Sequence, residues 1–250
     1  MFGVWAPLLW TAVFLVAIWW LSRRQAFYFL SAFFHLTRSQ QVAVVLYALF
    51  FLPGTVVHEF AHWGMAKVLG VKTAGFHVLP SLGGKGEIRL GSVDVRGGGL
   101  LEHTLIGMAP MLLGGLVTLA LSYYLVDVNA LYAAIRSEQF GGVADVALQA
   151  FSRPDALLWL WLLFTVSGSM FLSASDRAPI QQMALYLAAV LLPLYLFGFM
   201  PAIPQSWTQT IAEIFTVFAS GLAVALTVHL AMTLAFALFY LVARALRPGG

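Results

Sequence analysis

Long apolar stretches separated by short polar ones make up most of the chain. A helix needs about 20 apolar residues to cross a bilayer, and the pattern predicts about six such helices. Ala26–Leu36 is rich in Phe and Tyr but too short to cross, which favours an interfacial or re-entrant helix. The last stretch is longer than a bilayer requires, so we expect it to be tilted, broken near Gly221 or projecting from the membrane. The expected spans are Val4–Leu21, Val42–Leu69, Leu100–Val126, Ala156–Leu172, Ile180–Met200 and Trp207–Leu246.

Between residues 70 and 99 the continuous apolar pattern gives way to alternation of apolar and polar side chains. Thr73–Leu79 and Glu87–Val95 are predicted to be two strands joined through Leu82–Gly86. This places a small β-hairpin or sheet insertion directly after the second span. Such a sheet could present an edge to an extended peptide, or it could be a plain connecting hairpin, and the pattern does not separate the two.

The composition excludes a soluble globular protein. Hydrophobic residues make up 61% of the 250 positions and charged residues 9%, and the mean hydropathy is +0.90. There is no cysteine, so any metal must be held by histidine and carboxylate. The net charge of +3 includes no basic run typical of nucleic-acid binding, and no nucleic-acid partner is expected. The lipid bilayer is the first expected partner.

We therefore expect an α-helical polytopic membrane protein with one membrane domain. The first apolar stretch is followed, not preceded, by Arg23 and Arg24, which favours a spanning helix over a cleaved signal peptide. The expected parts of the domain are residues 1–41, with the first span and the interfacial helix; residues 42–179, the core with its β insertion at 70–99; and residues 180–250, with two C-terminal spans.

Three ionisable side chains, His58, Glu59 and His62, lie within five positions of the second span. Each costs at least ~2.5–3.5 kcal/mol at the centre of a spanning helix, so they need a partner or a water-filled cavity. Residues four apart share a helix face, so both histidines can direct a ring nitrogen to one point with Glu59 beside it. This HExxH pattern is typical of zinc peptidases, in which the glutamate acts on a water molecule. The alternative is a helix whose polar residues pair with neighbouring helices.

Pro53 and Gly54 directly precede this motif. They can kink the helix and free backbone carbonyls, which a membrane protein tolerates where the backbone lines a cavity. An ordinary kink is the alternative interpretation.

A catalytic zinc ion takes three protein ligands and keeps one position open. Asp176 is the best candidate for the third ligand, because the fourth span ends there at a depth similar to that of the histidines. The alternatives are a surface pair with Arg177 or a cap for the helix that begins at Ala178, and spacing alone leaves these open. If the second span ends in the cytoplasm, all three lysines and the majority of arginines plus lysines lie on that side, in agreement with the positive-inside rule.

The order of these elements resembles the site-2 protease family of intramembrane zinc metalloproteases, above all its small bacterial relatives. The likeness covers roughly Leu52–Pro179: an apolar helix with HExxH, a short sheet, another span and a helix that ends in Asp176. Gly86–Gly91 and Leu105–Pro110 are weaker supporting segments. The resemblance implies a Zn²⁺ cofactor, a metalloprotease-like core at 42–179 and cleavage of a transmembrane protein substrate. It also implies a bacterial inner membrane, with the active site toward the cytoplasm.

The chain departs from this family at its second motif, N-x-x-P-x-P-x-L-D-G. The resemblance assigns the motif's Asn to substrate contact, and Gly168 stands at that position, so Ser167 or Ser169 would have to substitute. Loss of one such donor typically lowers the rate by ~10²–10³, which leaves a catalytically impaired scaffold or complex subunit as the alternative function. Phe76 and Ile88 on the expected strands are further candidates for substrate contact. Aligned on Asp176, the remaining motif positions are Phe171, Ser173, Ser175 and Arg177.

A transporter with a polar path through Glu59, Glu213 and His229 is a further alternative. It would require ionisable residues on several spans to face one pathway. We expect His229 to be a packed, hydrogen-bonded helix residue, and His77 and His103 to lie on the surface or in loops.

Overall fold

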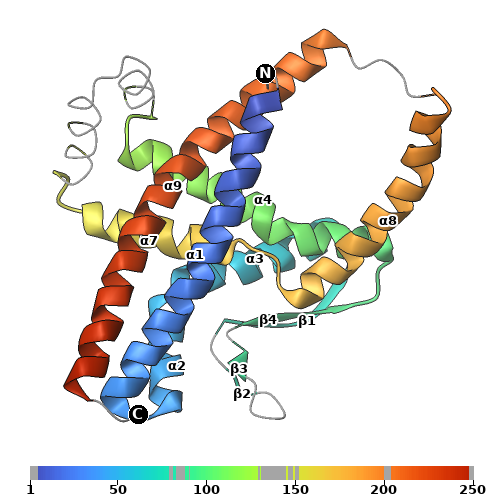
Figure 1. The fold of residues 1–250 in the computed structure, drawn as a ribbon. Helices are drawn as coiled ribbons and strands as arrows, with labels where there is room; N and C mark the ends of the chain where they lie inside the picture. The colour runs from blue at the N-terminus through green and yellow to red at the C-terminus, as the bar shows by residue number, and fades with distance from the viewer. Residues whose placement is uncertain are drawn as a thin grey trace.

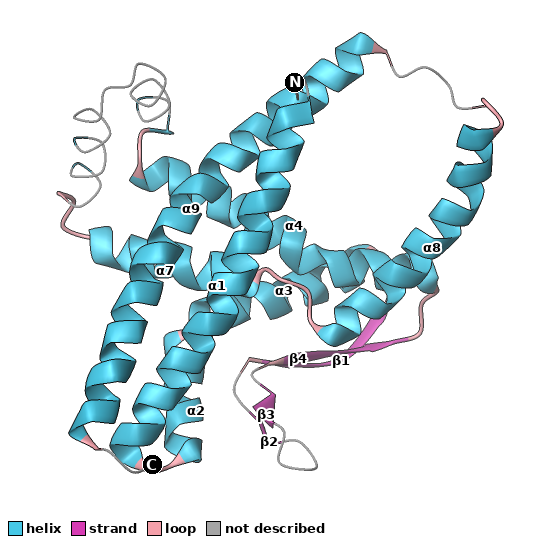
Figure 2. Cartoon of the chain, in the orientation of Figure 1, coloured by secondary structure: helices cyan, strands magenta, loops and turns pink. Residues whose placement is uncertain are grey.

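The computed structural model describes residues 5–78, 81–82, 88–89, 91–128, 130, 145, 149, 152–199 and 204–247, with side chains omitted at 81–82 and 88–89. Helices dominate this part of the chain, and the strands are confined to one small region (Figure 2). The helices are α1 (Ala6–Thr37), α2 (Gln40–Phe50), α3 (Leu52–Val68), α4 (Leu100–Leu125), α7 (Ala156–Ser169), α8 (Ala174–Leu196) and α9 (Gln205–Leu246). The strands are β1 (Lys72–His77), β2 (Ser81–Leu82), β3 (Ile88–Arg89) and β4 (Ser92–Arg96).

Four of these helices, α1, α4, α8 and α9, are long and apolar enough to cross a membrane. The pair α2 and α3 passes the same test together but is bent by 69°, so five spans are reached if this pair counts as one. The helix expected at Ala156–Leu172 ends at Ser169 after 14 residues. At 1.5 Å per residue it is about 21 Å long, shorter than the hydrocarbon core of a bilayer. The expected number of six spans is therefore not reached among the described residues.

Helix α1 is continuous, so the separate interfacial helix expected at Ala26–Leu36 is not formed. No proline or glycine interrupts the sequence between the first turn and Thr37. The guanidinium groups of Arg23 and Arg24 lie over the rings of Trp19 and Trp20, 4.5 and 5.1 Å from their centroids. The arginines are thus accommodated on the helix and do not end it.

Helix α9 is also continuous and runs parallel to α1 along most of its length (Figure 1). The break expected near Gly221 is absent. A Cβ atom at Gly221 would lie 2.7 Å from Leu119 Cδ1, so the glycine allows α4 to pack closely against α9. The buried hydrophobic core lies where α1, α4, α7 and α9 meet and includes Ile18, Leu163 and Leu222.

The expected break before the HExxH motif is present at Phe51, between α2 and α3. Pro53 lies in the first turn of α3, where its missing N–H leaves no hydrogen bond unmade. A Cβ atom at Gly54 would lie 2.1 Å from the Thr165 carbonyl oxygen, so this glycine permits close contact with α7. The Trp161 indole N–H of α7 donates to the Phe50 carbonyl at 3.1 Å, which ties α7 to the bend.

The β insertion follows α3 as expected, but its second strand is divided. β1 pairs antiparallel with β4, from Lys72 opposite Arg96 to His77 opposite Ser92, and β2 pairs with β3. Gly91 stands between β3 and β4, where a Cβ atom would lie 2.8 Å from Glu59 Cγ on α3. The insertion therefore packs directly on the motif helix. Leu79, the expected end of the first strand, and most of the expected loop at 127–155 lie outside the described residues.

Candidate metal centre

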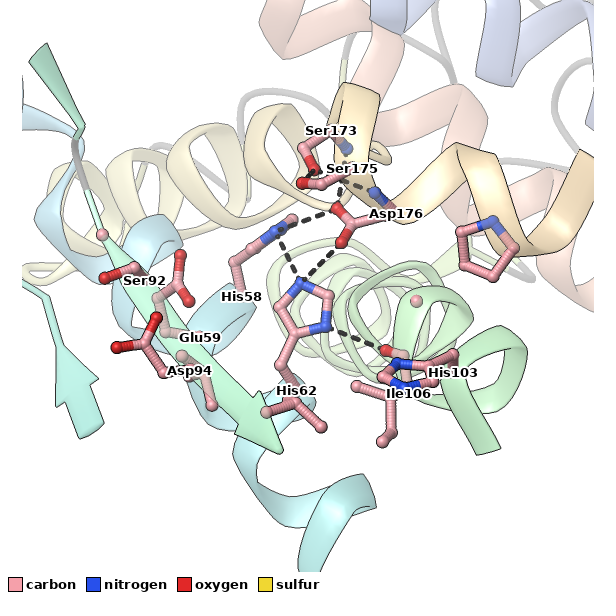
Figure 3. A pocket seen from close by; sticks show the side chains of 15 residues that line it. His58, Glu59, His62, Ser92, Asp94, His103, Ile106, Ser173, Ser175 and Asp176 are labelled. Atoms are coloured by element: carbon pink, nitrogen blue, oxygen red, sulfur yellow. Dashed lines mark hydrogen bonds and ion pairs between the residues drawn. The ribbon is translucent and has the colours of Figure 1, made fainter. Parts of the chain in front are cut away.

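Helix α3 and the first turn of α8 bring His58, His62 and Asp176 together (Figure 3). The two Nε2 atoms are 3.2 Å apart, His62 Nε2 is 3.4 Å from Asp176 Oδ1, and His58 Nε2 is 3.9 Å from Asp176 Oδ2. A tetrahedral ion with bonds of ~2.0–2.1 Å needs donor atoms about 3.3 Å apart. The three residues form a group that could hold a metal ion.

The opposite ring nitrogens of both histidines face backbone carbonyls. His58 Nδ1 lies 2.7 Å from the Ser169 carbonyl oxygen, and His62 Nδ1 lies 2.8 Å from that of Ile106. A carbonyl only accepts, so each Nδ1 carries the proton, and in a neutral imidazole Nε2 is then an unprotonated acceptor. With both imidazoles neutral, two nitrogen lone pairs and a carboxylate oxygen converge with no donor between them among the described residues. Histidines that bind metals are oriented by this kind of second hydrogen bond.

Asp176 takes part in a helix cap and also lies in the group that could hold a metal ion. It is the third residue of α8, where its Oδ2 accepts from the Ser173 backbone N–H at 2.8 Å and its own N–H donates to Ser173 Oγ at 3.2 Å. Oδ1 faces His62. The expectation that Asp176 ends the fourth span is wrong, because α7 ends at Ser169 and α8 begins at Ala174. An ion pair with Arg177 is not found in the described part of the chain.

Glycine allows the first turn of α8 to reach this point. A Cβ atom at Gly107 on α4 would lie 2.8 Å from the Asp176 carbonyl oxygen. The neighbouring residue Ile106 supplies the carbonyl that accepts from His62. Helices α4 and α7 therefore hold the histidines, and α4 also sets the position of the carboxylate.

Glu59 lies beside this group and faces strand β4. Its side chain is buried, 8% exposed, and Glu59 Oε1 would be 2.8 Å from a Cβ atom at Gly91. Among the described residues its carboxylate has no hydrogen-bond partner. Figure 3 shows Glu59 on the β4 side of the metal group, with His58 between it and Asp176. A carboxylate in this position is free to exchange a proton with water in the site.

A cavity of about 540 Å³ opens over these four side chains. This volume is within the range of small-molecule and peptide sites, ~300–1,000 Å³. Strand β4 and the residue before it contribute five consecutive lining residues, Gly91–Val95. The lining is completed by His103, Ile106, Gly107, Ser173, Ser175 and Pro179, and it includes no lysine or arginine among the described residues.

None of the known proteins compared with the chain matches it. This holds for protein-family models, for curated proteins and for solved structures. The function has to be inferred from the residues and geometry of the site alone.

The three candidates on α7, Ser167, Gly168 and Ser169, are not among the described residues that line the cavity. Ser169 contributes its backbone carbonyl to His58, and its hydroxyl donates to the Val166 carbonyl at 3.0 Å. Ser167 is fully buried and contacts His229, and a Cβ atom at Gly168 would lie 3.2 Å from His229 Cε1. Successive helix positions are about 100° apart, so Ser167 and Gly168 face α9 when Ser169 faces α3.

Of the two candidates on the strands, Phe76 makes no contact with the metal group among the described residues. The ring of Phe76 packs against that of Trp63, with centroids 6.4 Å apart, and does not line the cavity. Ile88 lies on β3, and its side chain is outside the described residues.

Sequence reasoning missed several residues that line the cavity: Ser92, Asp94, His103, Ser173 and Ser175. His103 was expected on the surface or in a loop, but it lies on α4 and faces the site. Ser173 and Asp176 form a capping box, and the spacing of Ser-x-x-Asp could have indicated it. The alternation of β4 placed Ser92 and Asp94 on one strand face, but not next to a cavity.

Proposed function

We propose that the chain is an intramembrane zinc metalloprotease that hydrolyses peptide bonds in membrane-embedded proteins. The observation that carries the proposal is the convergence of the His58 and His62 Nε2 atoms with Asp176 Oδ1, beside Glu59, whose carboxylate has no hydrogen-bond partner among the described residues. Zn²⁺ suits this donor set, because histidine and carboxylate are its ligands where cysteine is absent. Three protein ligands leave a position for water or substrate, as in catalytic zinc sites.

The protein groups can perform the proton transfers of hydrolysis. Bound Zn²⁺ supplies polarisation of the scissile carbonyl and lowers the pKa of water to ~7. Glu59 accepts a proton from the attacking water on a carboxylate oxygen, while the water oxygen bonds to the carbonyl carbon. The C–N bond then breaks, and Glu59 returns the proton to the amine nitrogen. Hydrolysis is complete with no other reactant.

A peptide bond in a membrane-spanning helix becomes accessible only after the helix unwinds. Its freed N–H and C=O groups then need partners, since each unsatisfied group costs several kcal/mol in an apolar environment. Strand β4 could supply them by adding the peptide as a further strand. Five consecutive residues of this segment line the cavity, which supports this mode of substrate binding.

The expected setting is a bacterial inner membrane with the site toward the cytoplasm. Lys67 at the end of α3 and Lys72 at the start of β1 lie on the side of the membrane where the HExxH helix ends. This agrees with the excess of basic residues in cytoplasmic segments. The partner would be a transmembrane protein, either as substrate or in a complex.

The substitution Glu59→Gln tests the proposal. Purified full-length wild type and variant, in liposomes with Zn²⁺, are given a single-span model substrate, and cleavage and bound zinc are measured. We expect Glu59→Gln to keep one zinc ion per chain and to lose cleavage by ~10²–10⁴-fold, as for loss of a general base.

Cleavage by Glu59→Gln at the wild-type rate would refute the proposed mechanism. Zinc bound by the wild type without cleavage of any membrane substrate would instead favour the alternative function, a non-catalytic scaffold or complex subunit.

A further inference from the structure

Strand β4 has one edge that is paired and one that is not. In the described part of the chain its only ladder is the antiparallel one with β1. The residues Gly91–Val95 line the cavity without interruption, which places this segment along the metal group. A peptide held against the unpaired edge would run beside β4 with its side chains in register with those of the strand.

The two faces of β4 differ in their surroundings. One face carries Val93 and Val95, and Val95 packs against the cluster formed by Ala66, Val71 and Ile106. Phe76, the register partner of Val93, contacts Trp63 on α3. This apolar face is therefore partly covered by α3 and α4.

The other face carries Ser92 and Asp94, opposite His77 and Gly75 of β1. Asp94 is exposed and makes no hydrogen bond or ion pair with any described residue. The His77 ring lies beside it, since His77 Nε2 is 3.0 Å and Asp94 Oδ2 is 3.8 Å from the position a Cβ atom would take at Gly75. Because Gly75 has no side chain, the His77 ring and the Asp94 carboxylate share the space over it, and the outer side of the carboxylate remains exposed.

The charges around the cavity are unbalanced. Glu59, Asp94 and Asp176 are in the lining, and no lysine or arginine is among the described lining residues. A divalent cation at the metal group would still leave a net negative charge when the histidines are neutral. A positively charged group on the substrate would reduce this imbalance, and a negatively charged group would increase it.

We propose that Asp94 is a specificity-determining residue that selects a substrate segment with lysine or arginine directly across from it. The inference rests on the proposed function, because it assumes a peptide held along β4. Side chains directly opposite each other on neighbouring strands are ~4.5–5.5 Å apart, where opposite charges attract and like charges repel. An acidic residue at that substrate position is disfavoured for the same reason.

Peptide binding tests this preference without relying on cleavage. The probe is a fluorescein-labelled ten-residue peptide of Val, Ala and Thr in which one residue, Lys, Gln or Glu, is moved through every position. Binding to the purified full-length Glu59→Gln chain with Zn²⁺ is followed by fluorescence anisotropy in detergent at low salt. At the position across from Asp94 we expect Lys to bind about fivefold tighter than Gln, and Glu to bind more weakly than Gln.

Two substitutions at position 94 and one elsewhere identify the source of the preference. Asp94→Asn should remove it, and Asp94→Lys should reverse it in favour of Glu. Glu213→Gln changes an exposed acid on α9 outside the cavity and should leave it unchanged. Bound zinc is measured in each variant to confirm that the site is folded.

Equal binding of Lys and Glu peptides at every position would overturn the inference, as would a preference that persists in Asp94→Asn or an absence of binding. Cleavage of the same peptides by the wild-type chain is scored separately. If binding depends on Asp94 but no peptide or membrane substrate is cleaved, the proposed protease function fails and the selective subsite stands.

Discussion

Two clusters of polar side chains lie among the apolar helices. They differ in how many of their polar atoms have hydrogen-bond partners. One is the metal group of His58, His62 and Asp176. The other joins α1, α7 and α9 through Gln25, Ser167 and His229, each of which is 0% exposed. Both place histidine in a segment where an ionised side chain is expensive.

Every polar atom of the second cluster has a partner. His229 Nδ1 donates to Gln25 Oε1 at 3.0 Å, and His229 Nε2 lies 3.0 Å from Ser167 Oγ. Gln25 Nε2 donates to the His229 carbonyl at 2.8 Å and to Thr233 Oγ1 at 2.7 Å. This confirms the expectation for His229, and among the described residues no hydrogen bond continues from this cluster toward Glu59. Glu213, the third member of such a path, is exposed on α9.

In the metal group only one ring nitrogen of each histidine is hydrogen-bonded to a backbone carbonyl. Its Nδ1 atoms are bonded to carbonyls, whereas its Nε2 atoms face each other and a carboxylate. A network in which each polar atom has a partner stabilises one packing arrangement, whereas the converging Nε2 atoms and carboxylate of the metal group could hold a cation. The surroundings of the second ring nitrogen therefore separate His229, a packed histidine, from the two histidines that could bind a metal.

The largest expected effect comes from replacing one histidine in each cluster. We expect His62→Ala to weaken zinc binding by more than ~10²-fold, beyond the 10–100-fold typical of outer-shell partners, since it removes a ligand. His229→Ala should keep zinc binding and instead lower the free energy of unfolding by about 3 kcal/mol, because it creates a cavity and leaves Ser167 and Gln25 unpaired. Zinc titration and thermal unfolding in detergent measure both quantities. A loss of zinc binding in His229→Ala as large as that in His62→Ala would contradict the distinction between the two clusters.

A smaller effect is expected where α3 meets α7. A methyl group at Gly54 would lie 2.1 Å from the Thr165 carbonyl oxygen, so Gly54→Ala should push these helices apart. Overpacking of this kind typically costs about 1–3 kcal/mol of stability. Zinc affinity should fall with it, because His58 is held by the Ser169 carbonyl of α7.

Gly64→Ala is the matched control on the same helix, since nothing lies within 4 Å of the added Cβ atom. It should leave zinc affinity unchanged and should not destabilise the chain, because alanine is the better helix former. Equal effects of the two substitutions would show that contact with α7 does not set the position of His58.

The sequence predicted those parts of the site that depend on local spacing. His58 and His62 share a face of any helix, so their convergence required no knowledge of the fold. Asp176 does lie with the two histidines, but the sequence assigned it to the wrong helix, because where one apolar helix ends and the next begins depends on the capping box at Ser173. The carbonyls of Ser169 and Ile106 carry no sequence signal, because every residue has one.

The predicted span ends and breaks were wrong at two places in the long helices α1 and α9. Arg23 and Arg24 suggested the end of a span, yet both stack on tryptophans of the same helix and α1 continues. Gly221 suggested a break, but it allows the approach of Leu119. Ser92 and Asp94 were predicted on a strand, although only the packing of β4 on α3 brings that strand to the cavity.

The smallest expected effects come from substituting two serines of α7 that stand two residues apart. Ser167 belongs to the second cluster, and the Ser169 carbonyl holds His58 of the metal group. Ser167→Ala leaves His229 Nε2 without a partner and should lower stability by about 1 kcal/mol. The Ser169 hydroxyl is bonded within its own helix, and the backbone carbonyl that holds His58 survives the substitution, so Ser169→Ala should change zinc affinity and cleavage by less than about threefold. If the Ser169 hydroxyl instead contacts the substrate in place of the missing asparagine, cleavage will fall by ~10²–10³ with zinc affinity intact. Steady-state cleavage kinetics, together with a zinc titration, distinguish these two outcomes. Only a loss of cleavage with intact zinc affinity would mean that α7 contacts the substrate as well as the metal ligand His58.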